Sequence, residues 1–385
     1  AVKGRHDVIR HILHCHSTFS LGGKEARAVR LMNAFGDAAE HTILSAVPDQ
    51  MGARDAIDPA IAVHFPTDAP SLQGKPGPGR YRTLADYMRG FDLVLSYNWG
   101  SMDVVGARRM FPAGCPPLIH HEDGFDHDEI ERLKWHRNWF RTIALQRTNA
   151  LVVPSKTLEK IARNIWHQPL DKICRFPNGI DTDHFNRRPQ RGAFPGFQKR
   201  NGEIVVGTIA GLRPVKNLPR LVRAVAAAGP NVRLAIAGEG PDRDAIMAEA
   251  GRLGIADRVM MPGFLRDPAR YIRLFDIFAL SSDSEQYPAS LVEAMTSALP
   301  IISTDVGDVR NIVSRYNRPY IVPRHDEDAF SSAIRTLATD AALRETLGAA
   351  NRLVACSQYD EETMFARYRQ LYGSAMKRAD FARQS

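Results

Sequence analysis

Several features that mark other protein classes are missing from this sequence of 385 residues. Its four cysteines, Cys15, Cys115, Cys174 and Cys356, include no Cys-x-x-Cys pair, so neither a zinc site nor a disulfide framework is expected. No apolar run approaches the roughly twenty residues that span a bilayer, and no signal peptide is recognisable. We expect a reducing, cytoplasmic location, with attachment at most to the inner face of the plasma membrane.

The sequence also lacks a cluster of charge of one sign. The formal net charge is +8, which favours an anionic partner such as a nucleotide or an acidic lipid surface. The basic residues are interspersed with nearly as many acidic ones, unlike the basic arm of a typical nucleic-acid-binding protein. We therefore expect no nucleic-acid partner.

What the sequence does contain is a short apolar run, a loop and an amphipathic segment, repeated many times. This order is typical of parallel strands joined by crossover helices. It predicts strands at 8–15, 42–47, 62–65, 93–96, 117–121, 150–154 and 173–176, and a second series at 204–210, 232–237, 259–261, 276–280, 300–303 and 320–322. Helices of the second series are predicted at 218–228, 242–253, 290–297, 327–338 and 361–377. The pattern indicates an α/β fold with two Rossmann-like, doubly wound parallel-sheet domains facing each other across a cleft.

A stretch punctuated by proline and glycine separates the two series. Residues 187–201 contain basic residues and no acid, as expected for an exposed linker. We predict an N-terminal domain at 1–186, a basic linker at 187–201 and a C-terminal domain at 202–359. The C-terminal helix at 360–385 is expected to pack back on the first domain.

Two glutamates mark a candidate ligand site in the second domain. Glu285 lies in an expected loop after a strand, and Glu293 lies inside the following helix. The N-terminus of a helix offers unpaired N–H groups to a phosphate, while nearby carboxylates accept hydrogen bonds from sugar hydroxyls. The alternative is an ordinary acid at a helix start and a solvated helical glutamate.

Other loops after strands carry candidate binding groups. Arg213 and Lys216 follow the first strand of the second domain and could neutralise a pyrophosphate leaving group, or be solvated charges. Gly22 and Gly23 follow the first strand of the chain, and Gly238 follows another strand, where a backbone without Cβ atoms can approach a ligand closely or simply turn.

A run of titratable residues ends one strand of the first domain. His120, His121, Glu122 and Asp123 stand where a general base or a hydrogen-bond acceptor for an incoming hydroxyl is expected. A structural role for each of them is the alternative.

Three short patterns have spacings that metal sites use, but we predict no metal. Asp126–Asp128 and Asp181–Asp183 fall in turn-like segments, and His14–His16 has no matching pair elsewhere in the sequence.

Residues 131–147 combine aromatic with basic side chains. A helix of this composition either lies on an anionic membrane or packs its apolar stripe against the domain core.

Taken together, these motifs resemble the retaining family-4 glycosyltransferases, also called glycosyl transferases group 1, which have the GT-B fold. The resemblance covers nearly the whole chain. It rests on Gly22-Gly23, Pro-Asn-Gly-Ile-Asp at 177–181, and the segments 213–217, 238–241, 262–264 and 285–295, all in the family's order. Glu285 and Glu293 match the family's E-x7-E signature.

The resemblance implies transfer of a sugar, with retention of configuration, from a nucleotide-diphosphate sugar to a hydroxyl acceptor. The donor would be a UDP- or GDP-sugar, and the acceptor a lipid-linked saccharide, glycolipid or polysaccharide precursor. The first domain would be the acceptor side and the second the donor side. Neither a metal nor a tightly bound cofactor is implied.

The resemblance also assigns roles to individual residues. Glu285 would contact the hydroxyls of the donor sugar, and Glu293 the ribose. Arg213 and Lys216 would bind the diphosphate. The remaining expected contacts are the Ser290 and Leu291 amides at the helix start, Gly263, Phe264 and Leu265 near the base, and His120, His121 or Asp123 near the reacting hydroxyl.

The sequence departs from the family's pattern at four positions. Gly211 stands where an arginine is usual, Gln286 where a glycine follows the first glutamate, Ala298 where a glycine follows the second, and Asp123 where some relatives have a histidine. These departures keep two alternatives open: a nucleotide-sugar-binding protein without turnover, and a GT-B epimerase that acts on a UDP-sugar.

Overall fold

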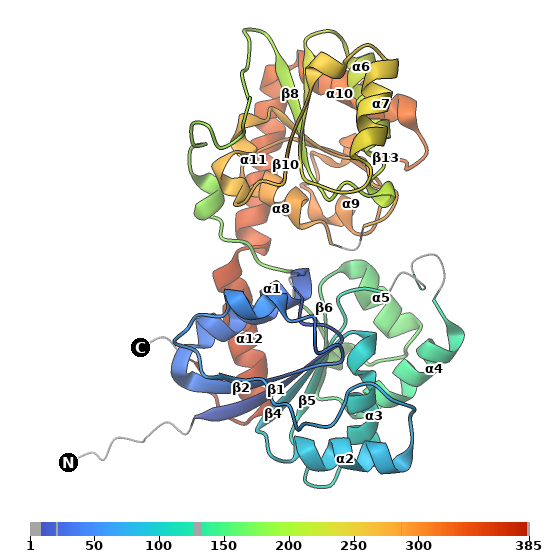
Figure 1. Cartoon of the computed structure of the whole chain (residues 1–385), viewed down its shortest axis with the longest axis vertical. Helices are drawn as coiled ribbons and strands as arrows, with labels where there is room; N and C mark the ends of the chain where they lie inside the picture. The colour runs from blue at the N-terminus through green and yellow to red at the C-terminus, as the bar shows by residue number, and fades with distance from the viewer. Residues whose placement is uncertain (1–8, 21, 126–128, 130–132, 286, 383–385) are drawn as a thin grey trace, which may run out of the picture. The chain divides into compact units, whose positions relative to one another are not determined.

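The contacts of the computed structural model, which describes residues 9–20, 22–125, 129, 133–285 and 287–382, divide the chain into two compact units (Figure 1). Unit 1 comprises Ala1–Asn178 and Met364–Ser385, and unit 2 comprises Gly179–Thr363. The first unit thus ends before the predicted boundary at 186. The stretch 187–201 belongs to unit 2, because Phe194 is buried in its core and the Gln190 N–H donates to the Arg270 carbonyl.

Unit 1 is built on a seven-stranded parallel sheet with the strand order β3-β2-β1-β4-β5-β6-β7. The strands are β1 (Arg10–His16), β2 (Ala39–Ser45), β3 (Val63–His64), β4 (Leu93–Tyr97), β5 (Leu118–His121), β6 (Ala150–Val153) and β7 (Ile173–Arg175). The helices are α1 (Gly23–Phe35), α2 (Pro78–Met88), α3 (Met102–Met110), α4 (Trp135–Ala144), α5 (Lys156–Asn164) and α12 (Glu361–Ala375).

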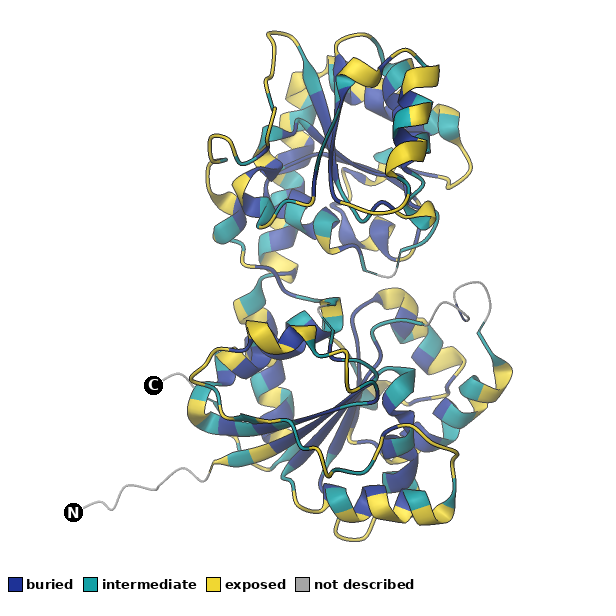
Figure 2. Ribbon diagram, in the orientation of Figure 1, coloured by how far each residue is buried: buried dark blue, intermediate teal, exposed yellow. Residues whose placement is uncertain are grey.

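Helices cover both faces of this sheet, because successive side chains of a strand point to opposite sides. On β1, Leu13 and Cys15 pack in a cluster with residues of α2, α3 and α5, whereas Ile12 packs with α1 and α12. Strands β4, β5 and β6 are buried along their whole length, as expected for a parallel sheet that is covered on both faces, and appear dark blue in Figure 2. The C-terminal helix α12 belongs to this core through Tyr368 and Tyr372.

Unit 2 has a six-stranded parallel sheet with the order β10-β9-β8-β11-β12-β13. The strands are β8 (Ile204–Ile209), β9 (Val232–Ala237), β10 (Val259–Gly263), β11 (Ile277–Leu280), β12 (Ile301–Thr304) and β13 (Ile321–Val322). The helices are α6 (Leu218–Ala228), α7 (Arg243–Arg252), α8 (Ala289–Thr296), α9 (Val309–Ile312), α10 (Glu327–Thr339) and α11 (Ala341–Gln358).

Both sheets reverse their strand order once. In unit 1 the chain places β2 and β3 on one side of β1, and β4 to β7 on the other. In unit 2 it places β9 and β10 on one side of β8, and β11 to β13 on the other. Loops diverge at such switch points, and ligands of doubly wound folds bind there at the carboxyl ends of the strands.

None of the helices in the described part of the chain combines the length and apolar character that crossing a bilayer requires.

Candidate active site

The switch point of unit 2 brings Lys216 and Glu285 together. Lys216 lies in the loop after β8, and Glu285 lies in the loop after its neighbour β11. The Lys216 ammonium donates to Glu285 Oε1 over 2.6 Å, and the Ser282 hydroxyl donates to the same oxygen over 2.6 Å. Both charged side chains are largely buried, at 17% and 9% exposure, which strengthens their interaction relative to a surface pair.

The two loops that carry this pair are joined along their backbones. The Ser281 hydroxyl donates to the Lys216 carbonyl over 2.9 Å, and the Asp283 N–H donates to the Val215 carbonyl over 2.8 Å. The buried Arg220 donates to the Ser281 carbonyl and to Asp283 Oδ1. These contacts fix the positions from which Lys216 and Glu285 reach the sheet edge.

Gly238 and Gly240 bring the loop after β9 against the loop after β8. A Cβ atom at Gly238, where φ is 153°, would lie 1.9 Å from the Ala210 carbonyl oxygen. A Cβ atom at Gly240 would lie 2.3 Å from the Leu212 carbonyl oxygen. The close approach therefore requires glycine, as the sequence indicated, although here the partner is backbone of the same unit.

The segment expected near a nucleotide base lies at the end of β10, two strands from β8. Gly263 ends the strand with a φ of 95°, and Phe264 is exposed at 65%. The Phe264 N–H donates to Glu239 Oε1 over 3.3 Å, and Leu265 packs against the core. Phe264 thus presents a large apolar ring at the same edge of the sheet.

Helix α8 starts at this edge without a side-chain cap. The Leu291 N–H is already bonded to the Pro288 carbonyl over 3.1 Å, so its predicted role at a phosphate would require that bond to be replaced. Ser290 is half-buried, and Glu293 lies on the next turn and is partly buried. Burial of Tyr271, together with the nearby Glu293 charge, raises the pKa of the Tyr271 phenol. Gln286, the other residue predicted here, lies outside the described residues.

Arg213 is the exposed member of the predicted phosphate-binding pair. It lies in the loop after β8 near Gly211, whose added Cβ would be 3.4 Å from Arg213 Nε. The Arg213 guanidinium thus lies beside Gly211, the position where the family that the sequence resembles usually has an arginine.

In unit 1 the glycine pair lies at the start of α1. Gly22 is the N-cap, with extended backbone and no side-chain cap, and Gly23 is the first helical residue, with open space around its Cα. The two residues follow β1 and lead into α1, as predicted.

His120 and His121 do not lie at the surface, contrary to their predicted place beside a reacting hydroxyl. His120 is fully buried, with Nδ1 2.8 Å from the Ser96 hydroxyl. His121 Nε2 is 2.9 Å from the Tyr372 hydroxyl. Burial, together with the nearby Arg27 charge, lowers the pKa of His121 well below its ordinary value. His120, His121 and Glu122 are all buried, so the run of titratable residues that ends β5 is not a solvent-facing cluster.

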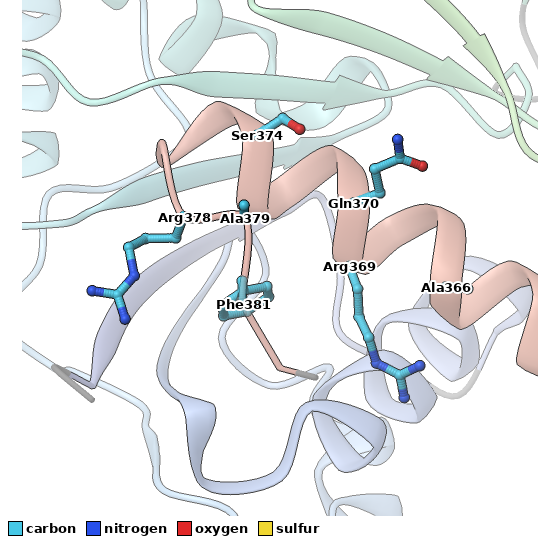
Figure 3. Close-up of a pocket in the computed structure, with 7 residues that line it drawn as sticks. All are labelled: Ala366, Arg369, Gln370, Ser374, Arg378, Ala379 and Phe381. Carbon is cyan, nitrogen blue, oxygen red and sulfur yellow. The ribbon is translucent and has the colours of Figure 1, made fainter. Parts of the chain in front are cut away.

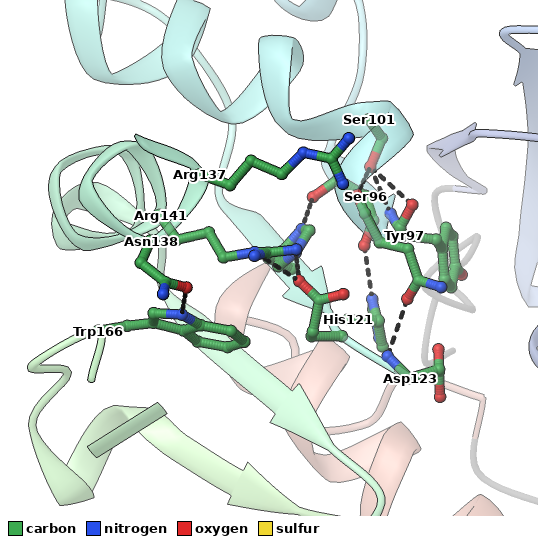
Figure 4. Close-up of polar contacts among 12 residues, drawn as sticks. Ser96, Tyr97, Ser101, His121, Asp123, Arg137, Asn138, Arg141 and Trp166 are labelled. Carbon is green, nitrogen blue, oxygen red and sulfur yellow. Dashed lines mark hydrogen bonds and ion pairs between the residues drawn. The ribbon is translucent and has the colours of Figure 1, made fainter. Parts of the chain in front are cut away.

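Asp123 is the member of that run that reaches solvent. It follows β5 and is among the residues drawn in Figure 4. Its side chain is 12% exposed. Its preceding neighbour Glu122 is fully buried beside the guanidinium of Arg141, which stacks near Trp166. Of the residues predicted in this run, the structure therefore favours Asp123 as the one available to a ligand.

The described residues contain no cluster of three or more metal-ligating side chains. His14 is buried and contacts His41 and Tyr97 through its two ring nitrogens, at 3.0 and 3.1 Å. Asp181 accepts N–H groups of its own turn. The Asp126–Asp128 pattern lies outside the described residues.

A cavity of about 620 Å³ lies elsewhere, along α12 (Figure 3). It contains none of the predicted site residues; its lining is Ala366, Arg369, Gln370, Ser374, Arg378, Ala379 and Phe381.

The aromatic and basic stretch predicted at 131–147 forms α4 in its described part. Trp135 and Trp139 are exposed at 80% and 63%, while Arg137 and Arg141 turn inward to Glu129. The exposed surface of α4 therefore carries aromatic rings, but fewer cationic side chains than the sequence suggested.

Two family models match the sequence, one in each half of the chain. The family described as Glycosyltransferase Family 4 matches residues 21–184, and the family described as Glycosyl transferases group 1 matches residues 191–354. Among curated proteins, the chain is similar to a D-inositol 3-phosphate glycosyltransferase of Stackebrandtia nassauensis, with 26% identity over 52% of this chain and 49% of that one. It is also similar to a 2-deoxystreptamine N-acetyl-D-glucosaminyltransferase of Streptomyces fradiae, with 31% identity over 64% of this chain and 60% of that one. The chain spans about half the length of the curated relatives it matches.

Two solved structures share the fold over almost the whole chain. HepE of Anabaena in complex with UDP has a TM-score of 0.76 at 18% identity, covering 94% of this chain and 100% of that one. Sucrose-phosphate synthase of Thermosynechococcus elongatus has a TM-score of 0.73 at 19% identity, covering 96% and 100%. One family model matches each half of the chain, and the structure has two parallel-sheet units. The chain therefore belongs to the family-4, group 1 glycosyltransferases with the GT-B fold.

Proposed function

We propose that this protein transfers a sugar, with retention of configuration, from a nucleotide-diphosphate sugar to a hydroxyl acceptor. The observation that carries the proposal is the Lys216–Glu285 pair at the switch point of unit 2, beside the uncapped start of α8. A cation, a carboxylate and a helix N-terminus at one sheet edge are the groups that a sugar diphosphate needs. HepE, which shares the fold, has been solved with UDP and with UDP and glucose, which supports a UDP-sugar as the first donor to test.

In the proposed reaction the donor diphosphate draws Lys216 from Glu285. Lys216 and the exposed Arg213 then bind the phosphate oxygens, and Glu285 accepts hydrogen bonds from sugar hydroxyls. Glu293 faces the ribose and the Phe264 ring lies near the base. These groups stabilise the charge that develops on the leaving phosphate.

Retention follows if the acceptor hydroxyl attacks from the face that the phosphate leaves. The bond between the anomeric carbon and the phosphate oxygen breaks, and the bond between that carbon and the acceptor oxygen forms. The acceptor proton passes to the departing phosphate oxygen. Asp123, at the carboxyl edge of the unit 1 sheet, accepts a hydrogen bond from a second hydroxyl of the acceptor, next to the one that reacts. Positioning and charge stabilisation then supply most of the rate acceleration.

We further propose that the acceptor is a lipid-linked saccharide, glycolipid or polysaccharide precursor, and that the protein works at the inner face of the plasma membrane. The exposed rings of Trp135 and Trp139 support this proposal, because indole side chains favour the interface of a bilayer.

Nucleotide release tests the proposed function. UDP-, GDP- and ADP-sugars are each incubated with the protein, with and without a membrane lipid extract, and the free nucleoside diphosphate is measured. Release from one donor, enhanced by the extract and reduced in Glu285→Gln, is the expected result. Nucleotide binding without release would favour a binding protein without turnover, and an epimerised sugar nucleotide would favour an epimerase.

A further inference from the structure

The buried Arg27 forms an ion pair with Asp123, the partly buried aspartate that follows β5. Arg27 lies on α1 and its side chain is 1% exposed. Its guanidinium contacts both oxygens of Asp123, Nη1 to Oδ1 and Nη2 to Oδ2, the latter over 2.8 Å. Such a two-point contact fixes the orientation of a carboxylate as well as its position.

Arg27 is itself held in place from two further sides. Nη1 also donates to Asn178 Oδ1 over 2.8 Å, and the guanidinium carbon lies 5.9 Å from the centre of the Tyr368 ring. Burial disfavours the charge on Arg27, but the Asp123 carboxylate beside it raises the pKa of the guanidinium above its ordinary value. The arginine is therefore a fixed cation, not a mobile surface charge.

Asn98 holds the backbone of Asp123. The Asp123 N–H donates to Asn98 Oδ1 over 2.8 Å, and the Asn98 N–H donates to the His121 carbonyl over 2.8 Å. Asn98 has a φ of 57° and a ψ of −174°, a conformation that residues other than glycine rarely adopt. Strain of this kind is kept where surrounding contacts enforce it, and it concentrates at functional sites.

The exposure of the pair separates it from an ion pair that only stabilises the core. Arg141 in the same unit contacts Glu122 and Glu129, and all three side chains are at most 1% exposed. By contrast, the Asp123 side chain keeps 12% exposure at the carboxyl edge of the sheet, after β5. A carboxylate has about four lone-pair sites, and Arg27 occupies two of them. The remaining sites can accept a hydrogen bond from a ligand hydroxyl.

We infer that Arg27 and Asn98 are positioning residues that hold the Asp123 carboxylate in one orientation to bind a hydroxyl of the acceptor next to the one that reacts. The inference rests on the proposed function. Asp123 accepts a hydrogen bond from that neighbouring hydroxyl and so orients the acceptor, while the proton of the reacting hydroxyl leaves with the phosphate oxygen of the donor. The role of Arg27 and Asn98 is thus geometric, and their loss should affect transfer to the acceptor far more than reaction of the donor with water.

The test compares two rates on the donor that the nucleotide-release panel identifies. One rate is nucleotide release with membrane lipid extract, and the other is the slower release without it. The variants are Arg27→Met, Arg27→Lys, Asp123→Asn and the double variant Arg27→Met/Asp123→Asn. Arg10→Met is the matched control, because Arg10 also pairs with an aspartate, Asp92, but at the first residue of β1, the opposite edge of the same sheet.

We expect Arg27→Met to lower the extract-dependent rate by roughly 30-fold or more, since misplacing a group by about 1 Å costs on the order of 100-fold. The extract-independent rate should change by less than about twofold. Arg27→Lys should be intermediate, because lysine keeps the charge and loses the two-point contact. The double variant should be no slower than Asp123→Asn alone, since Arg27 acts through Asp123.

Asn98→Gly keeps the inference testable if Arg27→Met fails to fold. Glycine relieves the strained backbone, so the melting temperature should hold or rise, while loss of the side chain that holds Asp123 should lower the extract-dependent rate about tenfold. The inference is overturned if Asn98→Gly and Arg27→Lys transfer at the wild-type rate, or if each variant lowers both rates together. Absence of release by the wild type would overturn the proposed function, and this inference with it.

Discussion

Lys216 Nζ lies 2.6 Å from Glu285 Oε1, so a cation from the loop after β8 and a carboxylate from the loop after β11 neutralise each other at the switch point of unit 2. Both side chains are largely buried, and each of the two loops supplies one of the two opposite charges. In the proposed reaction a donor diphosphate takes the place of the carboxylate beside Lys216, and Glu285 is then free to bind the sugar. Under that proposal the pair links binding of the two halves of the donor.

Replacing Lys216 should impair donor use specifically. In Lys216→Met, kcat/KM for nucleotide release should fall about 100-fold or more, because a cation aimed at the leaving phosphate is lost and Glu285 is left unpaired. The matched control is Lys199→Met. Lys199 also pairs with a carboxylate, Asp276, over 2.7 Å, but just before β11 begins, at the opposite edge of the sheet. An equal loss in both variants would show that the Lys216 pair is merely structural.

The glycine contact between the loops after β8 and β9 should be intolerant of a methyl group. Gly238→Ala should destabilise unit 2 by about 2 kcal/mol or more, since its Cβ would overlap the Ala210 carbonyl and its φ is positive. Gly251→Ala is the control, because Gly251 is inside α7 with nothing within 4 Å of an added Cβ. It should stabilise the protein by about 0.5–1 kcal/mol. Urea denaturation measures both values, and similar effects of the two changes would refute the packing argument.

The buried histidines of unit 1 should make it sensitive to acid. Burial lowers the pKa of His41 to about 4, and burial together with His41 lowers the pKa of His14 well below its ordinary value. These histidines stay neutral in the folded protein but bind protons in the unfolded chain below about pH 6.5. Their contribution is therefore fully present above that pH and is lost as the pH falls toward 4. For His41 the loss is on the order of 3 kcal/mol.

Thermal unfolding between pH 7 and pH 4 checks this expectation. The melting temperature of the wild type should fall as the pH is lowered, and His41→Gln, which cannot take up a proton there, should show a shallower fall. A melting temperature that stays level or rises on acidification would contradict it.

The sequence predicted the architecture better than the site. Each predicted strand is present with small shifts at its ends, because apolar runs in a doubly wound sheet stand out regardless of tertiary contacts. Helix α11 was not predicted. The first unit ends before residue 186, because Ile180 and Phe185 pack in the core of unit 2, and Phe194 places the apparent linker in the same core.

A candidate site residue could be predicted from the sequence only where its position relative to the neighbouring strand and loop marks it. Lys216 and Glu285 were identified from loops after strands, but their mutual contact joins residues far apart in sequence. His120 and His121 were misplaced, since a polar run at a strand end does not reveal which side chains turn inward. Arg27 was missed altogether, because an arginine on a helix looks solvent-exposed until its partners at 123 and 178 are known.

The exposed indoles of α4 predict weak membrane binding. The double change Trp135→Ser/Trp139→Ser should reduce cosedimentation with anionic vesicles several-fold, because two interfacial anchors are lost. Leu353→Ser serves as the control, since Leu353 is 74% exposed on α11. Binding of the wild type should weaken with added salt. Equal binding to neutral and anionic vesicles would contradict the expectation that the protein binds an anionic membrane surface.

The most direct test of the proposed activity is nucleotide release by the wild type and Glu285→Gln across UDP-, GDP- and ADP-sugars. Glu285→Gln keeps the shape of the side chain and removes the charge that pairs with Lys216. That charge is also the one proposed to bind the sugar. The account predicts release from one donor, falling about 100-fold or more in the variant, while the nucleoside diphosphate itself still binds. Release that is unchanged in Glu285→Gln, or wild-type protein that binds nucleotide and releases none from any donor, would contradict it.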